Sequence, residues 1–178
     1  MYGQIFNIRS NDYRVDTGDN IVRVLTNQGV VKMNFDRIPN KDCLGKYNTF
    51  VSHAISGNVG RVDSMGQQKI FGKHGILKPN EACSDTYLVI GNFNTIDEAV
   101  NCDKYLCSKF ARLLVLMRLK STIMSPKVFT DVPLQDFTSS SDIDWTQSIQ
   151  DIDKQLYKKY NLSKEEIDYI ERTIKPMA

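Results

Sequence analysis

Residues 86–90 (Thr-Tyr-Leu-Val-Ile) and 94–98 (Asn-Thr-Ile-Asp-Glu) decide the fold more than any other part of the sequence. The first stretch is a short run of apolar and β-branched residues, which is typical of a central strand buried on both faces. In the second, Thr95 is a helix N-cap and Glu98 follows three residues later, which is a capping box. A central strand followed at once by a helix predicts a sheet with a helix packed against it.

The helix that begins after Thr95 has a long apolar face. Apolar residues recur along it at intervals of three and four, at Ala99, Cys102, Leu106, Phe110, Leu113 and Met117. Acidic residues lie at its start, and Arg118 and Lys120 lie at its end, as the helix dipole favours. The pattern is compatible with one long helix or with two helices joined by a kink.

Upstream of this helix the sequence predicts several strands and one long loop. Residues 4–8 and 49–55 have strand character, and residues 21–35 alternate around a turn at Asn27-Gln28-Gly29, which predicts a hairpin. The segment 56–75 contains five glycines and no clear period, so we expect a long loop with at most a short strand at 69–71.

The last forty residues predict two helices after the polar run 138–141. The second of them begins with a capping box of Ser163 and Glu166. We therefore expect an α+β fold: a mixed or antiparallel sheet, one long packed helix and a C-terminal helical hairpin. The expected domains are a body at 1–137 and the hairpin at 138–178, packed on the body or on a partner.

Charge is unevenly distributed along the chain. Residues 1–130 carry 17 Lys and Arg against 11 Asp and Glu, a net charge of +6, whereas residues 131–178 carry 6 against 10, a net charge of −4. A basic body is compatible with binding to phosphates, although a merely solvated surface is equally so. The start of the chain lacks a signal-peptide layout and no apolar run reaches membrane-spanning length, so we expect a cytoplasmic protein that does not contact a membrane.

The cysteines and histidines form no recognisable metal-binding pattern. They are Cys43, Cys83, Cys102, Cys107, His53 and His74. No Cys-x-x-Cys pair is present, and residues 102 and 107 fall on different faces of a helix. We therefore expect reduced thiols, no metal and no cofactor. A reactive pair of Cys83 with either histidine is less expected than a buried cysteine beside the central strand.

Motifs for catalysis are absent from the sequence. It has no Asn/Asp-Pro-Pro-aromatic tetrapeptide of an amine methyltransferase, no phosphate-binding Gly-x4-Gly-Lys-Ser/Thr loop, and no Asp/Glu-x-Lys of a metal-dependent nuclease after a strand. We expect no catalytic residue in this chain.

Residues suited to DNA binding are found in the glycine-rich loop and near it. The candidate contacts are Arg61, Lys69, Lys73, Ser84, Thr86, Lys109 and Arg112. Cations contribute affinity for phosphates, and the amides of Asn58, Gln67 and Gln68 suit the edge of adenine. The alternative is that the loop is a plain surface loop and that the cations of the helix are simply solvated.

Several stretches resemble the C-terminal target-recognition region of bacterial restriction–modification enzymes. They are 47–50 with 54–57, 83–91, 109–114, 132–137, 156–163 and 174–177. The resemblance covers about residues 41–177 and is weakest at 58–75. It implies a non-catalytic fragment whose partners are duplex DNA and the catalytic domain or subunit of the parent enzyme. Whether this chain is an enzyme stays open, and the parent that the resemblance implies is a restriction endonuclease or an adenine-specific DNA methyltransferase.

Two other functions are kept as alternatives. The chain is a protein-interaction module if residues 138–177 dock onto the catalytic domain through an outward apolar patch. It is a cryptic nuclease if carboxylates converge in the fold.

Overall fold

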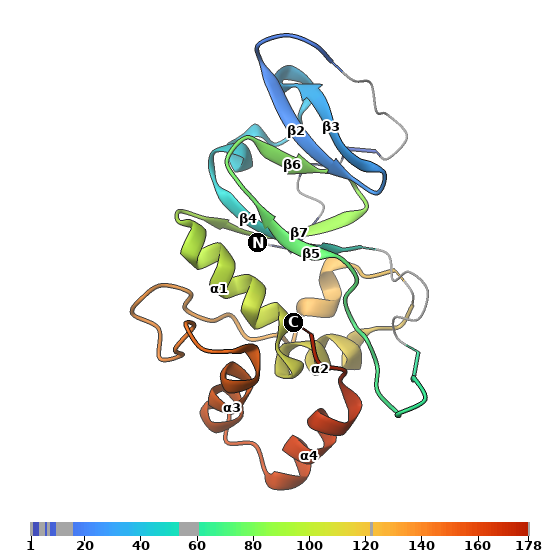
Figure 1. The fold of residues 1–178 in the computed structure, drawn as a ribbon, viewed down its shortest axis with the longest axis vertical. Helices are drawn as coiled ribbons and strands as arrows, with labels where there is room; N and C mark the ends of the chain where they lie inside the picture. The colour runs from blue at the N-terminus through green and yellow to red at the C-terminus, as the bar shows by residue number, and fades with distance from the viewer. Residues whose placement is uncertain are drawn as a thin grey trace.

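The computed structural model describes residues 2–3, 6, 8–9, 16–53, 61–121 and 123–177. In chain order the elements are β1 (Tyr2–Gly3), β2 (Ile21–Thr26), β3 (Gly29–Asn34), η1 (Phe35–Arg37), η2 (Lys41–Gly45), β4 (Tyr47–Ser52), β5 (His74–Leu77), β6 (Glu81–Cys83), β7 (Tyr87–Phe93), α1 (Ile96–Cys107), α2 (Lys109–Arg118), η3 (Pro126–Phe129), α3 (Ile149–Lys159) and α4 (Lys164–Thr173). Figure 1 shows a small sheet at one end of the molecule, a second sheet in the middle and the helices at the other end. The predicted α+β class is confirmed.

Two sheets form the strand-rich part of the fold. One has four strands in the order β1-β7-β4-β5, all antiparallel, and the other has the order β3-β2-β6, in which β2 pairs antiparallel with β3 and parallel with β6. The predicted hairpin is β2–β3, closed by a turn that pairs Thr26 with Gly29. As the sequence predicts, β7 is an inner strand.

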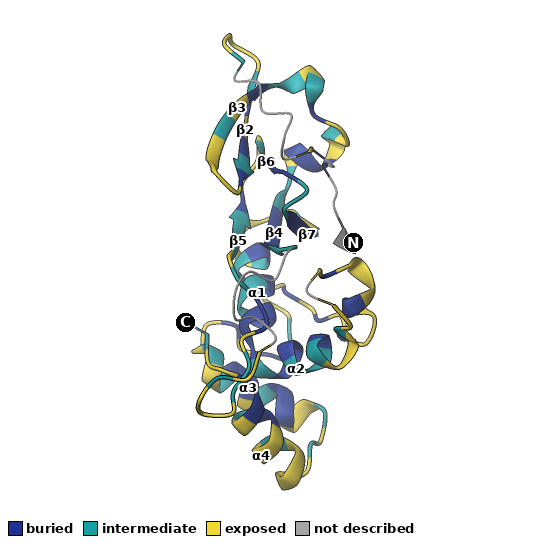
Figure 2. Ribbon diagram, turned by 90° about the vertical axis from the view of Figure 1, so that its right-hand side faces the viewer, coloured by how far each residue is buried: buried dark blue, intermediate teal, exposed yellow. Residues whose placement is uncertain are grey.

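The four-stranded sheet separates two hydrophobic cores. Tyr87 and Val89 of β7 belong to the core shared with the small sheet, whereas Leu88 and Ile90 belong to the core shared with the helices. Because successive side chains of a strand point to opposite faces, both faces of β7 are apolar. This explains the uninterrupted apolar run at 86–90, and Figure 2 shows the buried residues lying on the inner faces of the elements.

The helical pattern that begins after Thr95 forms two helices, α1 and α2. Of the two alternatives, the kinked pair is therefore correct, and the expected single long helix is wrong. Ser108, between α1 and α2, has an extended backbone with φ −62° and ψ 147°. Its hydroxyl accepts a hydrogen bond from Ala111 N at 3.1 Å and donates one to Tyr105 O at 2.6 Å. The serine therefore begins α2 at the point where α1 ends.

The C-terminal hairpin, α3 and α4, packs on the body. Ile152, Leu156 and Ile170 belong to the same core as Leu88 and Phe110. The expected boundary at 137/138 therefore lies within one hydrophobic core. The two cores of the molecule are separated by the four-stranded sheet. No helix in the described part of the chain is long and apolar enough to cross a membrane.

Two strands and part of the loop differ from the sequence expectation. Strands β5 and β6 were not predicted, and no strand forms at 69–71; beside that segment, Gln68 forms only isolated bridges with Val62 and Ile174. Residues 74–77 contain glycine and little apolar alternation, so their pairing with β4 is set by the sheet rather than by local pattern. The predicted strand 4–8 lies mostly outside the described residues, and Ile8 pairs with Ser84.

Candidate functional site

One end of the four-stranded sheet brings together three segments that are distant in sequence. Ser52, the last residue of β4, donates from its backbone N to Lys73 O at 2.8 Å, and His53 N donates to Thr86 O at 2.8 Å. The Ser84 and Thr86 hydroxyl oxygens lie 2.6 Å apart. The predicted contacts Lys73, Ser84 and Thr86 therefore lie around the end of β4.

The loop that leads to β5 is held at the C-terminal end of the chain. Gln68 N donates to Thr173 O at 2.8 Å, and Lys175 N donates to Gln68 O at 3.0 Å. Ile70 and Phe71 are fully buried in the core below the sheet. The described residues 61–73 are thus anchored by backbone hydrogen bonds at Gln68 and by packing at Ile70 and Phe71. The predicted amide contact Asn58 lies outside the described residues.

Three predicted cations of this loop are exposed. They are Arg61, Lys69 and Lys73, and none forms an ion pair with another described residue. Elsewhere about half of the described cations pair with a carboxylate, among them Lys109, Arg118, Lys154, Lys159, Lys164 and Lys175. Others, such as Lys32, Lys78, Lys120 and Lys127, are exposed with no ion pair to a described residue. What distinguishes the loop is that three exposed cations without an ion pair lie together on residues 61–73, where their charge is available to a ligand.

Arg112 is contradicted as a DNA contact because its side chain is 0% exposed. Its Nε donates to Cys107 O at 3.1 Å and its Nη1 to Lys175 O at 2.6 Å, so it connects the end of α1 with the C-terminal segment. Burial lowers its pKa to about 10. The helical periodicity placed this residue on a polar flank, but α3 and the C-terminal segment cover that flank.

Two other predicted contacts are also poorly placed for a ligand. The Lys109 side chain is 12% exposed, and its Nζ pairs with Glu171 at 2.5 Å. Ser84 is buried, whereas Thr86 is half-buried. Of the seven predicted contacts, the three loop cations are exposed and Thr86 is half-buried.

A polar cluster that the sequence analysis missed lies directly beside Lys73. His74, the first residue of β5, places Nδ1 3.0 and 3.2 Å from the two carboxylate oxygens of Asp103 on α1. The Cys107 Sγ lies 3.5 Å from His74 Nδ1 and 3.7 Å from Nε2. The hydrogen bonds to Asp103 and then to Cys107 raise the pKa of His74 to about 10. Within the described ranges, this is the one group of three potential metal ligands.

Part of this cluster could be found from sequence. Asp103 and Cys107 are four residues apart, a spacing that places both on one face of a helix. The prediction of no metal site rested on the missing Cys-x-x-Cys pair and on the different helix faces of Cys102 and Cys107. No local signal indicated that His74, 33 residues before Cys107, lies on the strand that this face covers. Cys83, considered as a reactive thiol, is buried, and burial raises its pKa to about 12.

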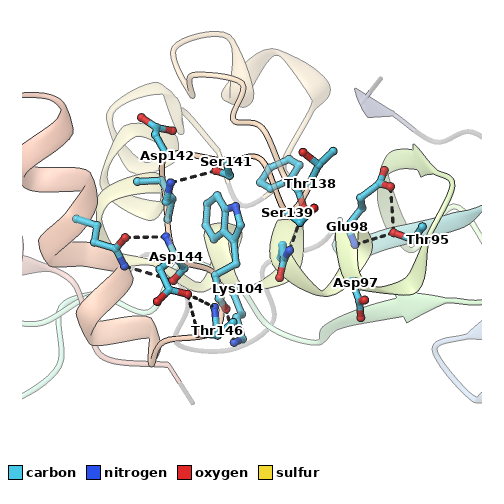
Figure 3. A pocket seen from close by; sticks show the side chains of 15 residues that line it. Thr95, Asp97, Glu98, Lys104, Thr138, Ser139, Ser141, Asp142, Asp144 and Thr146 are labelled. Carbon is cyan, nitrogen blue, oxygen red and sulfur yellow. Dashed lines mark hydrogen bonds between the residues drawn. The ribbon is translucent and has the colours of Figure 1, made fainter.

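An acidic cavity of about 890 Å³ lies between the start of α1 and the segment after residue 137. Asp97 and Glu98 come from α1, and Asp142 and Asp144 come from the facing loop (Figure 3). The Nζ of Lys104 is occupied by Trp145 O at 2.6 Å. The cavity therefore presents negative charge and is unsuited to phosphate. Figure 1 places residues 138–147 on the side of the helices opposite to the loop 61–73.

No protein-family model, curated protein or solved structure matches this chain. The resemblance to restriction–modification enzymes therefore stays a prediction from the quoted residues.

Proposed function

We propose that this chain binds duplex DNA through the loop 61–73 and the adjoining end of the four-stranded sheet. The observation that carries the proposal is the set of exposed, unpaired cations Arg61, Lys69 and Lys73 on one anchored loop. Cations that are free of internal carboxylates release counterions when they meet phosphates, and this release supplies most non-specific affinity for DNA.

The charge distribution supports one orientation of the duplex. The acidic cavity and the basic loop lie on opposite sides of the helices (Figure 1). Phosphates are repelled by Asp97, Asp142 and Asp144 and attracted by the loop. Because electrostatic steering acts before contact, the loop side is the side that meets DNA.

Base reading is assigned to side chains beside these cations. Gln67 and Gln68 are half-buried, and Gln68 is fixed through its backbone by the C-terminal segment. Glutamine amides suit the major-groove edge of adenine, and the half-buried Thr86 hydroxyl suits a phosphate or a base edge. Ser84 is left out of this set because it is buried.

As part of the same proposal, the chain is a target-recognition fragment of a restriction–modification enzyme. The support is the resemblance of residues 41–177 and the lack of catalytic motifs in the sequence. The catalytic domain or subunit of the parent enzyme is the expected second partner. A bacterial DNA-binding protein of this kind functions in the cytoplasm.

The interaction-module alternative needs an outward apolar patch on the C-terminal hairpin. On the described parts of α3 and α4, Tyr169 is the one large apolar side chain that is exposed, and Arg172 lies over its ring at 5.8 Å. Ile152, Leu156 and Ile170 are buried in the core. No extended patch on this hairpin favours docking.

The nuclease alternative needs carboxylates that converge on a divalent ion. Among the described residues, the cluster of three potential ligands contains one carboxylate, that of Asp103. The acidic side chains of the cavity do not form such a group. This geometry favours binding over cleavage.

The test is the salt dependence of binding to short duplexes by the full chain. R61A/K69A/K73A removes three charges from the loop, and K154A/K158A/K164A removes three exposed charges from the hairpin as a matched control. We expect the loop variant to bind more weakly and to lower the log–log salt slope by about 3, because each phosphate contact contributes about 0.9. The control should retain the slope of the unmodified chain.

Two results contradict the proposal. One is no binding of the unmodified chain at low salt. The other is an equal loss in both triple variants, which would indicate a diffuse effect of net charge rather than binding at the loop.

A further inference from the structure

We propose that His74, Asp103 and Cys107 together bind a zinc ion whose fourth position is open to solvent. The inference goes beyond DNA binding and does not depend on it. It starts from three different donor atoms, a ring nitrogen, a carboxylate oxygen and a sulfur, which all lie within 4.8 Å of one another. Two of these residues come from α1 and the third from β5.

The spacing of the donors suits one tetrahedral ion. Zinc bonds of about 2.0–2.2 Å to nitrogen and oxygen and about 2.3 Å to sulfur give tetrahedral edges of about 3.4 Å between N and O and about 3.6 Å between N and S. The structure has 3.0 Å from His74 Nδ1 to Asp103 Oδ1 and 3.5 Å from Nδ1 to Cys107 Sγ. The Asp103 carboxylate and the Cys107 Sγ lie within 4.8 Å of each other, so small side-chain rotations that draw these two donors together would complete the site.

The donor types select zinc among the common ions. Mg²⁺ and Ca²⁺ prefer oxygen ligands, so a site with one carboxylate, one imidazole and one thiolate is unsuited to them. Thiolate and imidazole together are typical zinc ligands. Three protein ligands leave one position free.

The site is accessible on one side. The side chains of His74 and Asp103 are 23% and 20% exposed, whereas Cys107 is buried at 2%. The open position therefore faces solvent on the histidine and aspartate side, where water can occupy it. The sulfur lies inside, and the guanidinium of Arg112 interacts electrostatically with Cys107. A thiolate formed on metal binding would thus lie near a buried positive charge.

The order of contacts disfavours a catalytic cysteine. In a thiolate–imidazole–carboxylate relay, sulfur and carboxylate contact different ring nitrogens. Here both Asp103 oxygens lie on Nδ1, and Sγ is almost equally far from the two nitrogens. The carboxylate and the sulfur therefore do not take separate nitrogens of the ring, and this arrangement suits a shared cation better than a proton relay.

The ion would have a structural role because of where it lies. It would connect the first residue of β5 to two residues of α1, directly after the exposed Lys73. A metal bond at this point fixes the end of the basic loop to the helix.

The test is a titration of the full, reduced chain with Co²⁺ as a spectroscopic substitute for Zn²⁺, followed by displacement with Zn²⁺ in competition with a chromophoric chelator. We expect one equivalent to bind, with a thiolate-to-cobalt charge-transfer band and the intense visible bands of a tetrahedral ion. Cys107→Ser should abolish the charge-transfer band and lower affinity by about 100-fold or more, since loss of even an outer partner of a ligand costs about 10–100-fold. Cys43→Ala removes a thiol from the other core and should leave the titration unchanged.

His74→Gln provides a second variant because this side chain is partly exposed. Circular dichroism establishes that it is folded, and its affinity should fall by a similar factor. A chain that binds no Co²⁺, or a charge-transfer band that persists in Cys107→Ser, overturns the site and leaves the cluster as an ion pair only. Because no DNA is present, this result is independent of the proposed DNA binding.

Discussion

The carboxylate of Asp153 on α3 accepts a hydrogen bond from Phe110 N on α2 at 2.9 Å, although the residues are 43 positions apart. The other carboxylate oxygen accepts from Lys109 N at 3.0 Å. Together with the Ser108 hydroxyl, which receives Ala111 N, this carboxylate satisfies the first amides of α2. A residue of the C-terminal hairpin therefore caps the start of α2, at the break between α1 and α2.

Asp153 predicts a pH dependence of stability. Burial raises its pKa from 3.8 to about 6, against the lowering effects of the Phe110 and Lys109 amides and of Arg112 and with a further increase from Glu171. The folded state thus holds the proton more tightly than the unfolded state. The contribution of this group is most favourable below about pH 4 and is lost as pH rises through about 6, by about 3 kcal/mol in all.

The measurement compares the unmodified chain with Asp153→Asn by urea unfolding between pH 4 and pH 7. Other carboxylates titrate in both proteins, so the difference in unfolding free energy isolates this residue. Relative to the variant, the unmodified chain should gain stability as pH falls from 7 to 4. A difference that does not change with pH would contradict this assignment.

We expect a large loss of stability when the buried Arg112 is replaced. Arg112→Met leaves the carbonyls of Cys107, Ser108 and Lys175 without their buried donor and leaves Asp153 without a nearby positive charge. We expect the unfolding free energy to fall by about 3–5 kcal/mol. Arg172→Met on the exposed face of α4 serves as the control and should change it by about 0.5 kcal/mol or less.

The same pair of variants tests the correction to the predicted DNA contacts. Under conditions where Arg112→Met is folded, its DNA salt slope should match that of the unmodified chain. A slope lower by about 1 would return Arg112 to the interface.

The backbone conformation of β7 at Gly91 should not tolerate a side chain. Its φ is +135°, and a Cβ there would lie 2.5 Å from the ring of Phe93, which packs edge-on against Phe137. Gly91→Ala should therefore cost about 2–4 kcal/mol, from both the conformation and the clash. Gly45→Ala has open space around the new Cβ and should change stability by about 0.5 kcal/mol or less. Equal effects in thermal unfolding would contradict the constraint.

Replacement of Ser108 should lower the unfolding free energy moderately. Ser108→Ala removes the acceptor of Ala111 N and the donor to Tyr105 O, both in a fully buried position. We expect about 1–2 kcal/mol. Far-UV circular dichroism should stay unchanged because Asp153 still caps α2. Ser139→Ala, on an exposed loop, is the control, and a comparable loss there would argue against a capping role.

The sequence predicted the elements whose signals are local. The apolar run at 86–90 identified β7, and the capping boxes at Thr95 and Ser163 identified the starts of α1 and α4, where the structure has both caps. Strand β5 was missed because residues 74–77 carry no strong period and owe their conformation to pairing with β4.

By itself, the sequence determined the α+β class, the hairpin β2–β3 and the two C-terminal helices, because caps, turns and periodicity act between residues a few positions apart. Tertiary structure alone decided that Arg112 is buried while Lys73 is exposed, since helix periodicity does not state which polar flank a later helix covers. It also decided that His74 meets Asp103 and Cys107, 29 and 33 residues away. Convergence over such distances follows from how the sheet and helices pack, which no local pattern records.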